Sequence, residues 1–359
     1  MSRIGILIIT LIAAVLVAGF GDSLASSTGC QPEIGPTHTA RGSWLGADVA
    51  YSLVLPNQTT LWIFGDTFIG PVGAKDRAGS AMIANTVATS VCKDGEFIFE
   101  PHWLVDRQGN AKPIFDSQKL NDLGLIYWPA QPVLHEGQLF IPLMRMNRKT
   151  WGIEGTDLAR IDNPTDRHNQ WRIEILPLSS LWGIHPISSW LDDDYLYFMW
   201  NPKWNAIATR LPISRLQAAH FKPEREQFYL SQDEQWKPGL VVEDSKLLGL
   251  VANSGLTLKY QPDLQQWIVT YADFTDGISQ GIVTRTSPSP FGPWSEAKLI
   301  YSFDTEYARR PGIMCYTGFM HDQYSSANQT LVSYVCNEES EELFTDMGIY
   351  FPRFFAVSL

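Results

Sequence analysis

Two aspartates in a predicted β-hairpin are spaced so that they could act together as an acid and a base. The hairpin covers residues 46–67, and its turn is centred on Asn57. Asp48 and Asp66 each lie nine positions from Asn57. Strands paired symmetrically about this turn would place the two carboxyl groups directly opposite each other on one face. A register shift of one residue would move one of them to the other face.

Such a pair suits the hydrolysis of a glycosidic bond, which requires one protonated carboxyl group and one carboxylate across the scissile bond. Repulsion between two close carboxylates raises the pKa of one of them, so an acid and a base can coexist at the same pH. The structural alternative is that Asp48 caps a strand and that Asp66, which follows Gly65, is an ordinary turn residue.

Five further residues are candidates for contact with a substrate. Asn85 could hydrogen-bond a sugar hydroxyl, and Trp128 could stack on a sugar ring. Arg145 interrupts an apolar run, so we expect it to face a substrate channel and to pair with a carboxylate. His185 is a candidate substrate contact, and Arg310 could clamp hydroxyl groups or a carboxylate. The structural alternatives are a turn asparagine, a core tryptophan and a histidine satisfied within the fold.

Short β-branched and aromatic runs, such as residues 61–64 and 195–200, are separated by Pro, Gly, Asn and Asp and predict an all-β fold. The runs group into five units of similar internal order, which begin near Asp48, Tyr127, His185, Asn253 and Arg310. This spacing predicts a single five-bladed β-propeller over residues 26–359, with the first strand of each blade lining a central channel. A β-sandwich with insertions is the alternative.

The composition describes a globular chain of 359 residues, of which 45% are hydrophobic and 18% are charged. Thirteen Trp, thirteen Tyr and eighteen Phe residues supply flat faces for sugar rings, although we expect most of them to fill the β-core. The net charge of −11 and the lack of a basic run argue against a nucleic-acid partner. No phosphate loop, dinucleotide fingerprint or zinc-ligand spacing is present, so we expect no cofactor and no metal.

Residues 1–25 have the pattern of a signal peptide. Arg3 precedes an apolar run over residues 4–20, and small residues near Ala25 provide a cleavage site. An uncleaved membrane anchor is the alternative, because the run is just long enough to span a bilayer. We expect a secreted, periplasmic or cell-surface protein with no membrane contact beyond this segment, since no other stretch is long and apolar enough.

An exported protein is expected to pair its cysteines, and this chain has four, at positions 30, 92, 315 and 336. Three connectivities are open. We favour Cys30 with Cys92 and Cys315 with Cys336, because each bond then ties one end of the chain locally.

The sequence Leu-Trp-Ile-Phe-Gly-Asp-Thr-Phe over residues 61–68, together with Asp48 and residues 85–88, resembles the opening blade of the five-bladed propeller enzymes of glycoside hydrolase family 183. These are endo-D-arabinanases, formerly grouped as domain of unknown function 4185. The resemblance implies catalytic aspartates at Asp48 and Asp66. Residues 285–294 are similar to an outer-strand signature of many five-bladed furanosidases and related glycosidases.

The sequence therefore predicts a secreted glycoside hydrolase that acts on a furanose-containing, D-arabinan-like polysaccharide or oligosaccharide with a two-aspartate acid/base mechanism. The main alternative is a non-catalytic carbohydrate-binding or cell-surface propeller. A propeller scaffold for protein partners is a third hypothesis. Fold alone does not choose among them, so the choice depends on the chemistry of the site.

Overall fold

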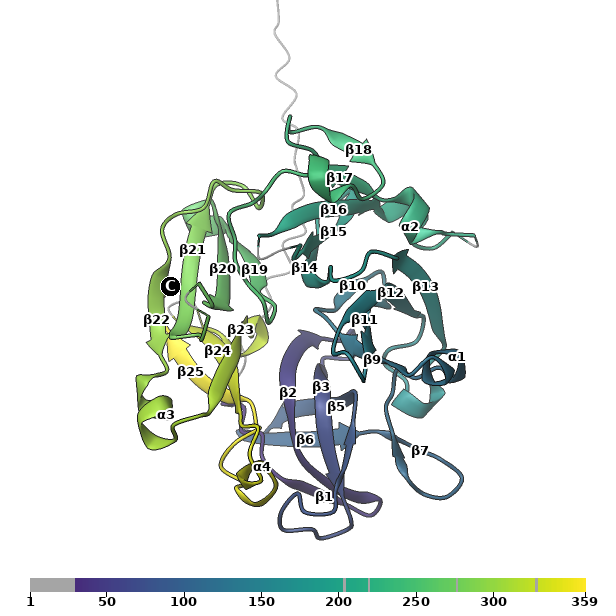
Figure 1. Ribbon diagram of the computed structural model, residues 1–359, viewed down its shortest axis with the longest axis vertical. Coiled ribbons are helices and arrows are strands. Elements are labelled where there is room, and N and C mark those ends of the chain that lie inside the picture. Colours follow the sequence, from purple (N-terminus) through teal and green to yellow (C-terminus); the bar gives the residue numbers. More distant parts are fainter. Residues whose placement is uncertain (1–29, 203–204, 219, 276, 327–328) are drawn as a thin grey trace, which may run out of the picture.

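The computed structural model describes residues 30–202, 205–218, 220–275, 277–326 and 329–359. Five antiparallel sheets follow one another around a ring and form a five-bladed β-propeller, as the strand pattern predicted (Figure 1). The predicted signal peptide, residues 1–25, lies outside the described residues. Among the described residues, no helix has the length and apolar character needed to cross a membrane.

Blade one carries the two candidate aspartates on its long central hairpin. Its strands are β1 (Thr37–Thr39), β2 (Gly42–Val54), β3 (Thr60–Gly70), β4 (Ala81–Ile83), β5 (Thr86–Lys93) and β6 (Glu96–His102). A small ribbon follows, made of β7 (Leu104–Val105) and β8 (Ala111–Lys112).

Blades two to five complete the ring, and each is a single antiparallel sheet. Blade two contains β9 (Leu125–Pro129), β10 (Val133–His135), β11 (Gln138–Asn147), β12 (Ile153–Ile161) and β13 (Ile173–Ser179). Blade three contains β14 (Pro186–Leu191), β15 (Tyr195–Trp200), β16 (Ile207–Pro212), β17 (Phe228–Leu230) and β18 (Trp236–Pro238). Blade four contains β19 (Thr257–Gln261), β20 (Gln266–Ala272), β21 (Gly281–Ser287) and β22 (Lys298–Ser302). Blade five contains β23 (Met314–Met320), β24 (Thr330–Asn337) and β25 (Arg353–Val357).

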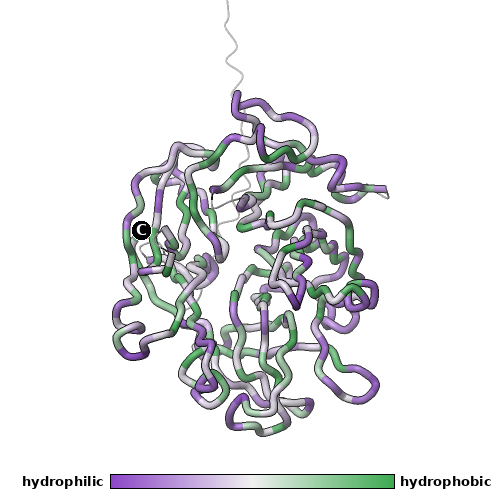
Figure 2. Tube along the Cα trace, in the orientation of Figure 1, coloured by the Kyte–Doolittle hydropathy of each residue, from purple (hydrophilic) through white to green (hydrophobic). Residues whose placement is uncertain are grey.

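The helices are short and lie in the connections between strands. They are α1 (Gln118–Asp122), α2 (Pro223–Glu226), α3 (Asp304–Arg309) and α4 (Glu342–Thr345). Single 3-10 turns cover His168–Gln170, Ile213–Arg215, Val242–Asp244, Pro262–Leu264 and Asp322–Tyr324. Hydrophobic residues follow the strands of the blades, whereas the outer loops are mostly hydrophilic (Figure 2).

The core lies between the blades, because the inner strands are apolar on both faces. Each pair of neighbouring blades shares one hydrophobic cluster. Leu61 of blade one packs in the same cluster as Leu139 of blade two. Trp62 of blade one shares a cluster with Leu331 of blade five, so the last interface closes the ring in the same way as the others.

The C-terminal segment lies beside blade one, but it closes the ring through side chains. Strand β25 pairs with β24 of its own blade. The ring of Phe351 lies 5.8 Å from that of Trp44, and the ring of Phe354 lies 5.9 Å from that of Trp62. Aromatic packing therefore joins the two ends of the ring.

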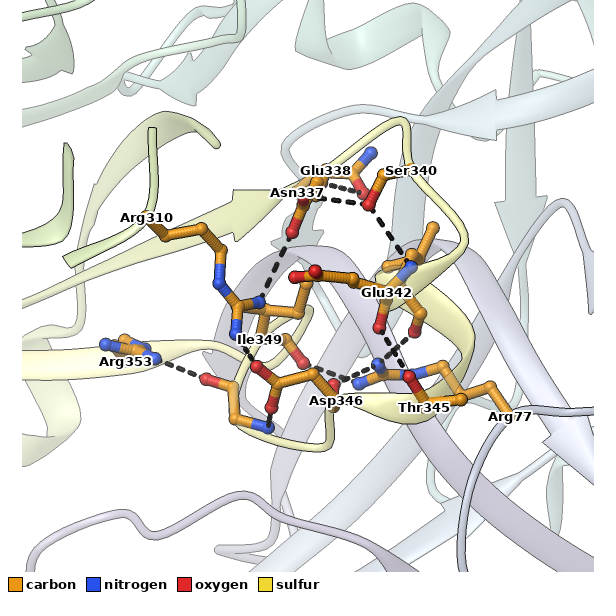
Figure 3. Close-up of polar contacts among 12 residues, drawn as sticks. Arg77, Arg310, Asn337, Glu338, Ser340, Glu342, Thr345, Asp346, Ile349 and Arg353 are labelled. Atoms are coloured by element: carbon orange, nitrogen blue, oxygen red, sulfur yellow. Dashed lines mark hydrogen bonds and ion pairs between the residues drawn. The ribbon is translucent and has the colours of Figure 1, made fainter. Parts of the chain in front are cut away.

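Arg77 adds a polar link across the same interface (Figure 3). Its guanidinium group is fully buried and donates hydrogen bonds to the carbonyl oxygens of Leu45, Leu343, Asp346 and Ile349. Burial lowers the pKa of Arg77 to about 10, which leaves the group charged at neutral pH. One blade-one side chain thus fixes the path of the segment that leads into β25.

Both predicted disulfide bonds are present. Cys30 is bonded to Cys92, and Cys315 is bonded to Cys336. The first bond ties the start of the described chain to β5, and the second joins directly paired residues of β23 and β24.

Candidate active site

All five blades contribute to one cavity of about 340 Å³. Its lining includes one or more residues from the inner part of every blade, among them Asp48, Trp128, His185, Asn253 and Tyr316. The sequence predicted this convergence correctly for blades one to four. In blade five the residue that lines the cavity is Tyr316 on β23. The predicted residue, Arg310, does not line the cavity.

The blade-one hairpin has the predicted register near its turn, where Ser52 pairs with Trp62. Register shifts then occur on both sides of Val49. Beyond them, Ala47 pairs with Thr67, which restores the symmetric register. The two shifts around Val49 therefore cancel, so the pairing is symmetric again at Ala47 while the backbone between is locally deformed. A third shift follows between Ala47 and Trp44, farther from the turn.

Asp48 and Asp66 lie within this deformed stretch. Val49 and Ala50 have positive φ angles of 74° and 73°, in a region that a β-branched residue rarely adopts. Such strain costs about 1–3 kcal/mol per residue and is concentrated at functional sites. Asp48 Oδ1 lies against Gly65, where any Cβ atom would overlap it. The bulge and the glycine together let the Asp48 carboxyl group lie against β3.

Burial and a neighbouring negative charge favour the protonated form of Asp48. The Tyr316 hydroxyl donates to Asp48 Oδ2 at 3.1 Å, whereas Oδ1 is buried without a hydrogen-bond partner. Burial and then the negative charge of Asp66 raise the pKa of Asp48 to about 8. Hydrogen bonds from Tyr316 and Tyr350 oppose this shift only in part. A carboxyl group of this kind can donate a proton at neutral pH.

The surroundings of Asp66 favour the ionised form of a carboxyl group more strongly than those of Asp48 do. Trp128 Nε1 donates to Asp66 Oδ1 at 2.9 Å. Burial raises the pKa of Asp66 to about 6, and the Trp128 hydrogen bond and the positive charge of Arg148 limit the shift. The surroundings therefore favour a proton on Asp48 more strongly than on Asp66.

His185 offers an unused acceptor at the cavity. Its Nε2 lies 3.2 Å from the carbonyl oxygen of Asn253, so this nitrogen carries the proton. Burial lowers the pKa of His185, which keeps the ring neutral. Nδ1 is buried without a partner and can accept a hydrogen bond from a ligand hydroxyl. His185 thus lines the cavity with a free acceptor, and its contact with a substrate stays a prediction.

Asn85 has a structural role, which corrects its prediction as a substrate contact. It is fully buried. Its Nδ2 donates to the carbonyl oxygens of Phe115 and Tyr127, and its Oδ1 accepts from the Phe115 N–H. The side chain thus connects blade one to blade two and has no group left for a sugar.

Arg145 pairs with a carboxylate as expected, but it does not line the cavity. Its Nη1 lies 2.6 Å from Asp157 Oδ1, and its Nη2 donates to the carbonyl oxygen of Ser179. Asp157 also accepts a hydrogen bond of 2.6 Å from the Tyr127 hydroxyl. The prediction of a substrate contact is therefore wrong, because this arginine joins three strands of blade two.

Arg310 was also predicted as a substrate clamp, and here too the structure shows a different role. The residue follows α3, and its guanidinium group forms ion pairs with Glu338 and Asp346 (Figure 3). These carboxylates belong to the loop after β24. Arg310 thus holds this loop in place, and its charge is already neutralised.

Sequence reasoning missed Tyr316, Tyr350 and Trp151. Tyr316 and Tyr350 reach Asp48 from positions about 270 and 300 residues later in the chain, so no local pattern connects them. The position of Tyr316 directly after Cys315 was an available signal, because a disulfide fixes the strand that carries it. Trp151 lies in the turn after β11 and lines the cavity.

A second cavity, of about 510 Å³, lies between blade one and the loop that connects β12 to β13. The imidazole rings of His102 and His168 stack there, with centroids 4.6 Å apart. Burial and the neighbouring His168 lower the pKa of His102 to about 4, so it is neutral. This cavity is larger, but Asp48, whose pKa is raised to about 8, lines the central cavity and not this one.

Fold and site thus define a five-bladed propeller whose central cavity is lined by Asp48, with the carboxyl group of Asp66 on the same hairpin. The chain belongs to the family described as Domain of unknown function (DUF5005), whose model matches residues 37–358. The matched family differs from the one that residues 61–68 resemble. No curated protein matches the chain.

Three solved structures have a similar fold. A candidate hydrolase from Bacteroides ovatus aligns with a TM-score of 0.64 and 14% identity, over 92% of this chain and 97% of its own. The GH43B protein of the Bacteroides ovatus xyloglucan PUL aligns with a TM-score of 0.52 and 11% identity, over 90% and 54%. An exo-beta-1,3-galactanase from Phanerochaete chrysosporium aligns with a TM-score of 0.50 and 11% identity, over 88% and 60%. At these identities the likeness establishes the fold.

Proposed function

We propose that this protein is a glycoside hydrolase in which Asp48 is the general acid and Asp66 is the base. The observation that carries the proposal is the pair itself: Asp48 lines the cavity, Asp66 on the same hairpin accepts a hydrogen bond from the cavity residue Trp128, and the two pKa values are raised to about 8 and about 6. Pairs of titratable groups whose surroundings separate their pKa values mark acid and base assignments.

The proposed reaction uses the proton of Asp48 and the negative charge of Asp66. Asp48 donates its proton to the glycosidic oxygen as the bond from this oxygen to the anomeric carbon breaks. Asp66 takes a proton from the water that attacks the anomeric carbon, so water supplies the new hydroxyl group. His185 Nδ1 accepts a hydrogen bond from a sugar hydroxyl, and Trp128 both orients Asp66 and offers its ring to the sugar.

For the substrate we propose a furanose-containing, D-arabinan-like polysaccharide. The support is the resemblance of residues 61–68 to family 183 enzymes and the fold shared with glycosidases such as the galactanase, which was solved with beta-1,3-galactotriose. We also propose that residues 1–25 direct export and that residues 26–359 form the mature domain. The two disulfide bonds support an oxidising compartment outside the cytoplasm.

The test compares Asp48→Asn and Asp66→Asn with the wild type on a panel of plant and bacterial polysaccharides that includes arabinans. Loss of a general acid or base costs about 100-fold to 10,000-fold in rate, so each variant should lose at least this much turnover. Asp193→Asn is the matched control, because Asp193 is exposed in the turn between β14 and β15. It should retain full activity.

Thermal melting separates catalysis from a structural role of the same residues. Because burial raises both pKa values above their ordinary 3.8, ionisation of the pair makes folding less favourable as the pH rises from about 4 to about 8. Asp48→Asn should therefore melt no lower than the wild type at pH 8. Full turnover in either variant would remove that residue from the mechanism. A wild type that binds polysaccharide without cleaving it would instead indicate a non-catalytic carbohydrate-binding propeller.

A further inference from the structure

Three tryptophans lead from the central cavity to the surface over blade two. Trp128 lies deepest, is partly buried and donates its indole N–H to Asp66. Trp151 lines the cavity mouth and is 61% exposed, and Trp182 is 72% exposed. Among the tryptophans that the described ranges contain, only Trp151 and Trp182 are exposed. Exposure of two large aromatic side chains beside a cavity marks a binding surface.

Trp128 and Trp151 are in ring contact, and Trp182 lies against Gly152, the residue after Trp151. The ring centroids of Trp128 and Trp151 are 6.1 Å apart, at an interplanar angle of 35°. The Trp182 indole lies over Gly152: a Cβ atom built on this glycine would be 3.4 Å from Cζ2 of the indole. The Gly183 N–H also donates to the carbonyl oxygen of Ile153 at 2.8 Å. The loop before β14 is thereby attached to the turn that carries Trp151.

The backbone holds Trp151 in its exposed position. In the turn between β11 and β12, the Trp151 N–H donates to the Asn147 carbonyl oxygen at 2.8 Å. Asn147 Oδ1 accepts from the N–H groups of Lys149 and Thr150. Trp151 has a φ of 54°, a conformation that costs energy for an aromatic residue and persists only where its surroundings impose it. The backbone of Trp151 is therefore held in place by its own turn, with the side chain exposed beside the cavity.

We propose that Trp151 and Trp182 form two successive sugar-binding subsites, so that the protein binds a stretch of several sugars along a polysaccharide chain. The proposal rests on the proposed function, because the row of Trp128, Trp151 and Trp182 begins at the proposed catalytic pair. Trp128 is hydrogen-bonded to Asp66. A sugar ring presents an apolar C–H face to an indole and keeps its hydroxyl groups in water, which suits a ring that is flat and exposed. A polymer that follows the row would have one bond at the carboxyl pair and further sugars on Trp151 and Trp182.

The test measures binding separately from turnover. Isothermal titration and affinity electrophoresis compare wild type, Trp151→Ala, Trp182→Ala and the double variant, each combined with Asp48→Asn to prevent cleavage. The ligands are the polysaccharide from the panel that the protein retains most strongly and its fragments of two to six sugars. Each single variant should bind the longer ligands about tenfold more weakly, which corresponds to about 1.4 kcal/mol. Binding of the two-sugar fragment should change little.

Tyr260→Ala is the matched control, because Tyr260 is an exposed aromatic residue on blade four that does not line the cavity. Its affinity for all ligands should equal that of the parent protein. Unchanged affinity in the double variant, or a wild type that binds no polysaccharide, would overturn the inference. So would a double variant that loses only self-association in sedimentation experiments, since the surface would then hold a second copy of the chain. Loss of binding in a protein that cleaves nothing would support the subsites and reject the hydrolase.

Discussion

Asp48 and Asp66 carry the same functional group on the same hairpin, yet their partners differ in chemical character. Asp48 receives hydrogen bonds from phenol groups, and its second oxygen has no partner. Asp66 accepts a hydrogen bond from the indole N–H of Trp128, and the positive charge of Arg148 stabilises its ionised form. Burial raises the pKa of both groups; the negative charge of Asp66 raises that of Asp48 further, whereas the Trp128 hydrogen bond and the charge of Arg148 lower that of Asp66.

The pH dependence of activity follows directly from this pair. The kcat/KM of the wild type should rise as Asp66 loses its proton through about pH 6 and fall as Asp48 loses its proton through about pH 8. Trp128→Phe removes a hydrogen bond that lowers the pKa of Asp66. In this variant the rise of kcat/KM on the acid side of the pH profile should therefore move to higher pH by about one unit. Initial rates from pH 4 to pH 10 provide the measurement. A profile with a single limb, or one that Trp128→Phe leaves in place, would contradict these roles.

The hairpin shows how far sequence reasoning could reach at the level of single elements. Its turn and the register of Ser52 with Trp62 follow from alternation and turn residues, and both were predictable. The two bulges around Val49 were not, because they cancel and leave no change in the spacing of the aspartates. Arg310 was misassigned for a different reason: its partners Glu338 and Asp346 lie in a loop whose path depends on the closed ring.

Gly65 offers a test of the bulged hairpin. Gly65→Ala would place a methyl group against Asp48 Oδ1, and the end of a side chain can move aside at little cost. We therefore expect at least a tenfold loss of kcat with a small change in melting temperature, since Asp48 is displaced while the strands remain paired. Gly35→Ala is the control, because no atom lies within 4 Å of its built Cβ. Equal activity of Gly65→Ala and wild type would show that Asp48 does not need this position.

At the scale of the whole molecule, the ring is closed by packing and by one buried cation. The five clusters between neighbouring blades follow from strands that are apolar on both faces, which is why the propeller was predictable from the sequence. Arg77 was not predictable, because its partners are backbone carbonyl oxygens that the sequence does not distinguish.

Arg77→Met should weaken ring closure. The substitution leaves four buried carbonyl oxygens without their donor, so the free energy of unfolding should fall by about 3 kcal/mol or more. Urea denaturation followed by tryptophan fluorescence measures this loss. Arg107→Met, at an exposed loop position, should unfold like the wild type. Equal stability of the two variants would mean that aromatic packing alone closes the ring.

Blade one and the later blades contribute different kinds of groups to the site: blade one contributes carboxyl groups, and the later blades contribute surfaces that a ligand would contact. Both carboxyl groups come from blade one, whereas the Trp128, His185 and Asn253 surfaces come from blades two, three and four. Exchange of a loop on one of these later blades would change which ligand fits without disturbing the proposed proton donor and acceptor. The architecture therefore allows related proteins to bind different ligands through changes in the later blades. The hairpin of blade one, which carries both carboxyl groups, can stay the same.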